Sequence, residues 1–298
     1  MKKYFLTECI TKDDVIHQGI YFEPKKKSNI AVLWVHGLSS SFYSHVPTCD
    51  AFAEMCEKRG YGYASFNNRG AGLISGPQKI DATALTGYTH VPGGAGQEKF
   101  EECVLDIDAG ITFLIDQGYK KIILVGRSTG ANKSCFYTGS VDDSRVVGVV
   151  LMSPISDRLE LVKSRPDTIA ITTYMKEQIA AGKGNIPMFG FHFFPLTPKR
   201  YLSLVEKGSK EDVFDYGDEE PKLTVFSNIT KPLFVILGEK DEHVDRAVAD
   251  IKKIFDAHTK SKKYTSSIVP GALHGFDGME KELACLVGEW IDCTFKLC

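Results

Sequence analysis

A serine between two glycines is the pattern in this chain that most directly indicates chemistry: residues 126–130 read GRSTG. Residues 122–125 are all apolar and predict a buried strand, and residues 129–136 can form a helix. Ser128 would then lie on a tight strand-to-helix turn, with its hydroxyl at the carboxyl edge of a sheet. Glycine at both flanking positions would prevent crowding on such a strained turn. The pentapeptide alone is equally compatible with a serine that caps a helix.

A nucleophilic serine needs a base, and the base needs an orienting acid. Asp241 follows an apolar run at residues 232–237, and His274 follows a short expected strand at residues 267–269. Both therefore come after strands, in the chain order serine, aspartate, histidine. Asp245 is the alternative acid, one helical turn further on, whereas His243 is too close in sequence to Asp241 to be the base and is expected to be exposed.

At this point the chain resembles the α/β-hydrolase family. Besides the serine turn, the matching segments are residues 238–241 (GEKD), 273–275 (LHG), 35–40 (VHGLSS) and 67–72 (NNRGAG). Arg127 stands where that family often has histidine, and Asn67 where it often has aspartate.

The resemblance implies roles for these residues. Ser128 would be the nucleophile, His274 the base and Asp241 the acid that orients it, with the backbone N–H groups of Leu38 and Thr129 as the oxyanion hole. The implied activity is that of a carboxylic ester hydrolase with a covalent acyl-serine intermediate and neither a metal nor an organic cofactor. The alternatives are a thioesterase or amidase, a lyase on the same fold, and a ligand-binding receptor that retains the three residues.

Strand and helix patterns alternate along the chain, which predicts a mostly parallel central sheet with helices on both faces. In the terms of the resemblance, this is an α/β-hydrolase fold with an inserted cap. The strands are expected at 15–22, 30–35, 61–66, 122–125, 146–152, 232–237 and 267–269. The helices are expected at 47–59, 97–116, 129–136, 244–255 and 281–295.

Residues 155–228 break this alternation and predict an inserted cap or lid between two parts of a core, 1–154 and 229–298. The cap contains an aromatic run at residues 189–194. We assign Phe191 and Phe193, together with Arg127 beside the nucleophile, to the binding of a small to medium apolar or aromatic ester. Packing of the cap is the other interpretation of the aromatic run. Three histidines are further candidates for the wall of the cleft: His45, His90 and His192.

Composition excludes several classes of protein. The 298 residues are 43% hydrophobic and 25% charged, with a formal net charge of −2, as in an ordinary globular protein. This balance indicates neither a nucleic-acid nor a membrane partner, and it does not indicate an oligomeric state. The eight cysteines form no CxxC pair and are expected to be thiols. Since the N-terminus lacks a sustained apolar stretch, a cytoplasmic location is expected.

Overall fold

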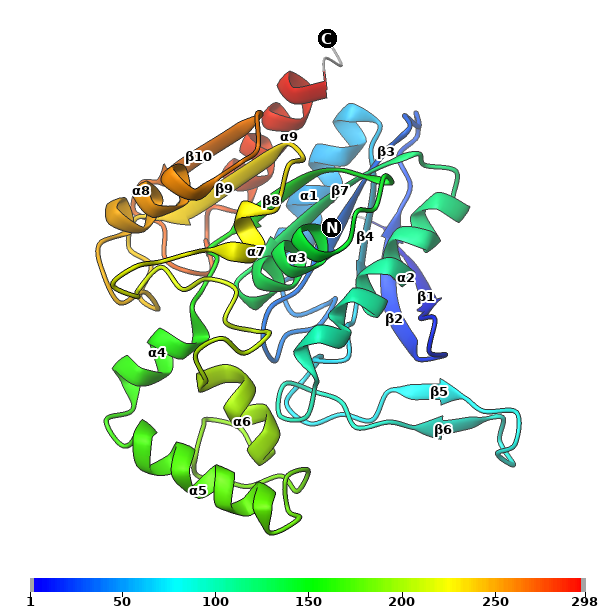
Figure 1. Ribbon diagram of the computed structural model, residues 1–298. Coiled ribbons are helices and arrows are strands. Elements are labelled where there is room, and N and C mark those ends of the chain that lie inside the picture. The colour runs from blue at the N-terminus through cyan, green and yellow to red at the C-terminus, as the bar shows by residue number, and fades with distance from the viewer. Residues whose placement is uncertain (1–2, 296–298) are drawn as a thin grey trace.

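The computed structural model describes residues 3–295 and has one large sheet at its centre (Figure 1). In order across the sheet, the eight strands are β1 (Phe5–Ile10), β2 (Ile16–Phe22), β4 (Gly62–Phe66), β3 (Ile30–Val35), β7 (Lys121–Arg127), β8 (Val146–Met152), β9 (Leu233–Gly238) and β10 (Tyr264–Val269). β2 pairs antiparallel with β1 and with β4, whereas all other neighbours in this sheet are parallel. The predicted mostly parallel sheet is thus confirmed.

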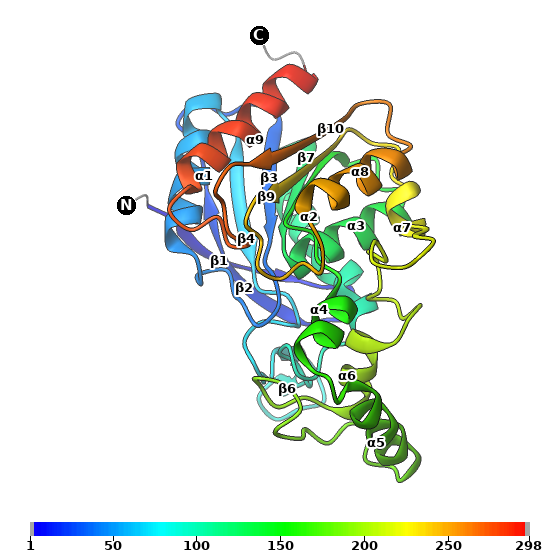
Figure 2. The same ribbon diagram turned by 90° about the vertical axis from the view of Figure 1, so that its left-hand side faces the viewer.

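Helices cover both faces of this sheet, as Figure 2 shows. One face packs against α1 (Val46–Arg59) and α9 (Glu280–Phe295), and the other against α2 (Cys103–Asp116), α3 (Thr129–Ser140) and α8 (Val248–His258). Every residue of β3 and β9 is buried, because both faces of these central strands are covered.

The predicted elements agree with the observed ones except near some of their ends. β1 was not predicted, because just one of its six residues is buried and its sequence therefore carries no apolar alternation. The helix expected from residue 97 begins as a 3₁₀ turn at Phe100–Glu102, and the helix expected from residue 244 begins at Val248. In the second case Asp241 accepts the backbone N–H of His243 at 3.0 Å, and this contact favours a turn over a helix.

Three helices of the expected cap lie beyond the carboxyl edge of the sheet (Figures 1 and 2). They are α4 (Asp157–Ser164), α5 (Thr168–Ala180) and α6 (Pro198–Val205), and they share a small core that includes Leu161, Met175 and Leu204. The following α7 (Thr224–Ser227) packs on α3 instead, and its Phe226 belongs to the main core. The last part of the expected insertion is therefore attached to the core.

A two-stranded hairpin of β5 (Gln78–Ile80) and β6 (Tyr88–His90) extends from the same end of the molecule (Figure 1). Seven cysteines are free thiols, as expected, and Cys298 lies outside the described residues. None of the helices within residues 3–295 has the length and apolar character that crossing a membrane requires.

Candidate active site

Ser128 lies at the corner between β7 and α3. Its backbone has φ 57° and ψ −132°, a strained combination that residues other than glycine rarely adopt. Two hydrogen bonds hold this conformation, one from Ser128 N–H to Met152 O (2.9 Å) and one from Ala131 N–H to Ser128 O (2.7 Å). The corner therefore places the serine directly beyond the carboxyl end of β7.

The flanking glycines are required by close backbone contacts. A Cβ on Gly126 would lie 2.1 Å from Gly130 O, and a Cβ on Gly130 would lie 2.1 Å from Val35 O. A Cβ on Gly37 would lie 3.1 Å from Ser128 Cβ. Thus the start of α3 packs directly on the end of β3 and the loop that follows it.

Asp241 and His274 form a close pair. His274 Nδ1 is 3.0 Å from Asp241 Oδ1 and 2.9 Å from Oδ2. Burial opposes ionisation of Asp241, but the hydrogen bonds from His274 and from the backbone N–H of His243 hold the pKa of this carboxyl below its usual value. An ionised Asp241 accepts a hydrogen bond from the Nδ1–H group of His274. In that tautomer Nε2 carries no proton and can accept one.

Three contacts hold the loop that carries His274. Ser153 Oγ donates to His274 O (3.0 Å), and His274 N–H donates to Glu242 Oε2 (3.0 Å). Arg127 Nη1 donates to Gly275 O (2.8 Å). Their partners on the sheet side lie at or just beyond the carboxyl ends of β7, β8 and β9, so this edge of the sheet holds the histidine loop in place.

Ser128 and His274 share the wall of a cavity of about 410 Å³. Across residues 3–295, no hydrogen bond joins the side chains of these two residues. Contacts of this kind are often loose without substrate and tighten when substrate binds. A larger cavity of about 740 Å³ has none of Ser128, Asp241 and His274 in its wall.

Leu38 and Thr129 also line the smaller cavity. Thr129 is the first residue of α3, where backbone N–H groups have no acceptor within the helix. Within the described part of the chain, neither Leu38 N–H nor Thr129 N–H donates a hydrogen bond to another protein group. Both are therefore available to a ligand.

The aromatic residues of the cap run occupy three kinds of environment. Phe191 and Phe193 line the cavity; Phe191 stacks on Tyr174 at 5.5 Å between ring centroids, and Phe193 is 75% exposed. Phe194 is 2% exposed and belongs to the core of the cap. Phe189 is 78% exposed and lies outside the cavity wall.

Arg127, which we assigned to substrate binding from the sequence, does not line the cavity. Its guanidinium lies over the ring of Trp34, 5.9 Å from the centroid, and binds Gly275 O. Since the side chains of neighbouring residues on a strand alternate in direction, Arg127 points away from the side on which Ser128 lies and binds the histidine loop instead.

Of the remaining candidates from the sequence, His192 lines the cavity, whereas His45 and His90 do not. Asp245 pairs with Arg246 at 2.8 Å, so Asp241 is the aspartate beside His274. His243 is exposed, as expected, but its ring centroid is 4.7 Å from that of His274.

Three residues of the site were not predicted from the sequence. Ser153 binds the loop that carries His274, and the acidic residues Asp157 and Glu160 line the cavity. One signal was available: Ser153 directly follows β8, which ends beside the strand that carries Ser128. Asp157 and Glu160 are on α4, and their place in the wall depends on how the cap folds back.

A family model described as "Protein of unknown function (DUF1749)" matches residues 89–291, more than half of the chain. The chain belongs to the DUF1749 family. The matched segment contains Ser128, Asp241 and His274, while the loop with Leu38 precedes it. A search of curated proteins found no match.

Solved structures share the fold of this DUF1749 protein at low identity. The Pyrococcus furiosus esterase Pf2001 has 21% identity and a TM-score of 0.60, covering 97% of this chain and 90% of the other. The siderophore hydrolase EstB from Aspergillus fumigatus has 14% identity and a TM-score of 0.67, covering 98% of both chains. Est1E from Butyrivibrio proteoclasticus, solved with ferulic acid bound, has 13% identity and a TM-score of 0.64, covering 97% of this chain and 98% of that one. The chain thus has the α/β-hydrolase fold predicted from its sequence.

We predict that Gly130→Ala destabilises the protein. In the interior of a helix, alanine is more favourable than glycine by about 1 kcal/mol. The added carbon, however, would lie 2.1 Å from Val35 O, and overpacking of this kind costs about 1–3 kcal/mol or more. The net loss should appear in denaturant unfolding, with Gly76→Ala as the control, because a Cβ there would have its nearest neighbour at 3.7 Å. Equal stability of the two variants would contradict the close backbone contact.

We predict that Arg127→Met lowers kcat/KM about 10-fold to 100-fold on neutral and acidic esters alike. The reason is that Gly275 loses its hydrogen bond and the His274 ring is misplaced. The measurement compares a neutral ester with one that carries a carboxylate. Arg59→Met is the control, since Arg59 pairs with Asp292 on a remote helix. A loss confined to the acidic ester would instead return Arg127 to substrate binding.

Proposed function

We propose that this protein is a serine hydrolase that cleaves carboxylic esters through a covalent acyl-serine intermediate. The observation that carries the proposal is the pairing of His274 Nδ1 with both Asp241 oxygens in a cavity whose wall also holds the strained Ser128. A serine hydroxyl, an imidazole base and a carboxylate that orients the imidazole are the three groups that nucleophilic acyl transfer requires.

In the first half of the reaction, Ser128 Oγ attacks the ester carbonyl carbon while His274 Nε2 takes the hydroxyl proton. Asp241 stabilises the resulting imidazolium. The N–H groups of Leu38 and Thr129 bind the oxyanion, a contribution worth about 10²–10³ in rate for each donor. The tetrahedral intermediate then collapses, and the alcohol leaves with the proton from His274.

In the second half, water attacks the acyl-serine carbonyl and gives a proton to His274. The carboxylic acid is released and Ser128 Oγ recovers its proton. Both halves of the reaction are carried out by side chains and backbone N–H groups of this chain, with water as the second reactant.

Two observations favour a substrate of small to medium size with an apolar or aromatic group. The cavity of about 410 Å³ is within the usual range for small ligands, and Phe191 and Phe193 form part of its wall. The proteins that share the fold include esterases, and one of them was solved with ferulic acid, an aromatic acid.

We predict that Ser128→Ala retains the fold and loses nearly all ester hydrolysis. A small hydroxyl at a half-buried corner contributes little to stability, whereas the covalent step needs it. Labelling by a fluorophosphonate probe, circular dichroism and turnover of p-nitrophenyl butyrate are measured together. Ser140→Ala is the control, because Ser140 is exposed at the far end of α3. Labelling or wild-type turnover of Ser128→Ala would eliminate Ser128 as the nucleophile, and an unlabelled wild type would favour the receptor alternative.

We predict that Phe193→Ala raises KM for aromatic esters more than for acetate esters and leaves the melting temperature nearly unchanged. Its ring is 75% exposed and so contributes little to packing. Phe194→Ala is the matched control: that ring is 2% exposed, and its removal should cost about 3–5 kcal/mol. A stability loss in Phe193→Ala with unchanged selectivity would show that the whole aromatic run is packing.

A further inference from the structure

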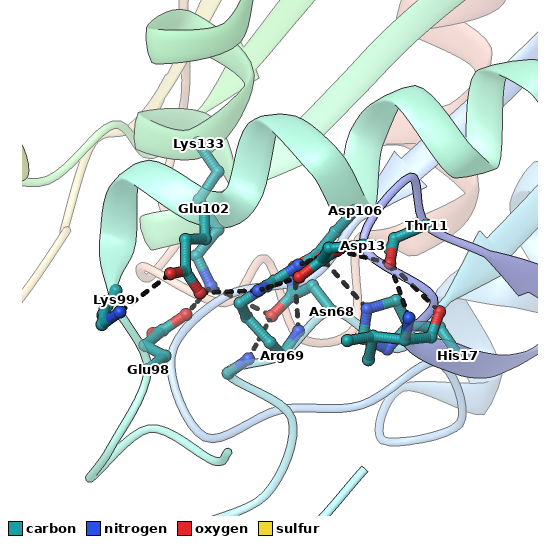
Figure 3. A network of polar contacts seen from close by, with 12 residues as sticks. Thr11, Asp13, His17, Asn68, Arg69, Glu98, Lys99, Glu102, Asp106 and Lys133 are labelled. Carbon is teal, nitrogen blue, oxygen red and sulfur yellow. Dashed lines mark hydrogen bonds and ion pairs between the residues drawn. The ribbon is translucent and has the colours of Figure 1, made fainter. Parts of the chain in front are cut away.

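A buried lysine on the helix of the nucleophile connects that helix to a neighbouring loop. Lys133 is 1% exposed, and its Nζ donates to Glu98 Oε2 at 2.6 Å and to Asn68 Oδ1 at 3.0 Å. Figure 3 shows these contacts beneath α3, beside a second group of ion pairs around Arg69 and Asp106. Lys133 lies on α3 just after Thr129, so its position is rigidly related to that of Ser128.

Asn68 is in turn hydrogen-bonded to His36. Asn68 N–H donates to His36 Nε2 at 3.1 Å, and so His36 Nδ1 carries the ring proton and donates to Gly37 O at 2.9 Å. Burial, with a smaller effect of the nearby Lys133 charge, lowers the pKa of His36 to about 4. The ring therefore stays neutral at pH 7 and keeps Nε2 as the acceptor that this arrangement needs.

The loop held by His36 contacts the nucleophile. Ser128 Cβ would be 3.1 Å from a Cβ on Gly37, and Leu38, the next residue, lines the cavity with Thr129. The sequence of contacts from Lys133 through Asn68 and His36 thus ends at one donor of the proposed oxyanion hole. Through α3 itself, Lys133 is attached to the other donor.

Lys133 makes a contact that charge balance does not require. Lys133 and Arg200 both pair with Glu98, and Arg200 also pairs with Glu211, so Lys133 contributes to the balance of the buried charges. Burial opposes ionisation of Glu98, but the two cations hold the pKa of this carboxyl below its usual value. Since an apolar pair of similar volume is often at least as stable as a buried ion pair, stability alone does not account for the lysine. The contact that charge balance leaves unexplained is the one with Asn68.

We infer that Lys133 is a positioning residue that sets the distance between the two oxyanion donors, Leu38 N–H on its loop and Thr129 N–H on its helix. This inference rests on the proposed function. It assigns Lys133 no contact with substrate, so its loss should weaken binding of the transition state and not of the ester.

The test is Lys133→Met, which keeps the length of the side chain and removes its charge and both hydrogen bonds. For p-nitrophenyl butyrate, we expect kcat to fall about 10-fold to 100-fold and KM to stay unchanged. This fall in kcat is somewhat smaller than the 10²–10³ that the loss of one oxyanion donor typically costs. The inhibition constant of a trifluoromethyl ketone, which forms an oxyanion on the serine, should rise by the same factor. The pH profile of kcat should not move, because Asp241 and His274 are untouched.

Two further variants keep the test decisive. Asn68→Ser removes the amide oxygen that accepts from Lys133 Nζ and from Gly70 N–H, and it keeps both the Lys133–Glu98 pair and the backbone N–H that binds His36. It should weaken the inhibitor in the same direction, even where Lys133→Met does not fold. Arg145→Met breaks ion pairs to Asp143 and Asp108 at the opposite edge of the sheet and should lower stability alone.

The outcomes separate this inference from the proposed function. Wild-type inhibitor affinity in folded Lys133→Met or in Asn68→Ser overturns the inference, as does an equal loss of affinity in Arg145→Met. A wild-type protein that neither hydrolyses the ester nor binds the ketone overturns the proposed function and the inference with it.

Discussion

The close approach of α3 to the end of β3 is the contact on which the rest of the site depends. It is possible because Gly130 has no side chain: a single added carbon would lie 2.1 Å from Val35 O. This approach puts Ser128 against Gly37 and brings Lys133 within reach of Asn68. The positions of Ser128, of the loop after β3 and of the buried lysine therefore have one common geometric origin.

Backbone strain and buried charge lie together at this one edge of the sheet. Ser128 has a strained backbone, Asp241 is an ionised carboxylate with its side chain 2% exposed, and Lys133 pairs with Glu98 away from water. The strain at Ser128 costs about 1–3 kcal/mol, a large share of the net stability of an ordinary domain. The buried charges are tolerated because each has hydrogen-bonded partners. Strain and buried charge concentrated beside a cavity are typical of a functional site.

The comparisons with solved structures support the fold, but they do not establish which reaction the site carries out. The three solved structures named above are 13–21% identical to this chain, and at such identity they show its fold alone. One fold hosts many reactions, so the proposal of ester cleavage rests on Ser128, Asp241 and His274 and on the cavity that Ser128 and His274 border.

The sequence by itself determined the fold class and singled out the candidate residues of the site. Apolar runs fix buried strands, and a glycine-flanked serine after such a run has few places to lie, so the order of Ser128, Asp241 and His274 was readable from local patterns. Tertiary structure decided the rest. The direction of Arg127, the support of His274 by Ser153, and the reach of Lys133 to Asn68 all join residues that are distant in sequence or differ by a side-chain direction. Such contacts leave no periodic signal, because they depend on how strands and loops pack in three dimensions.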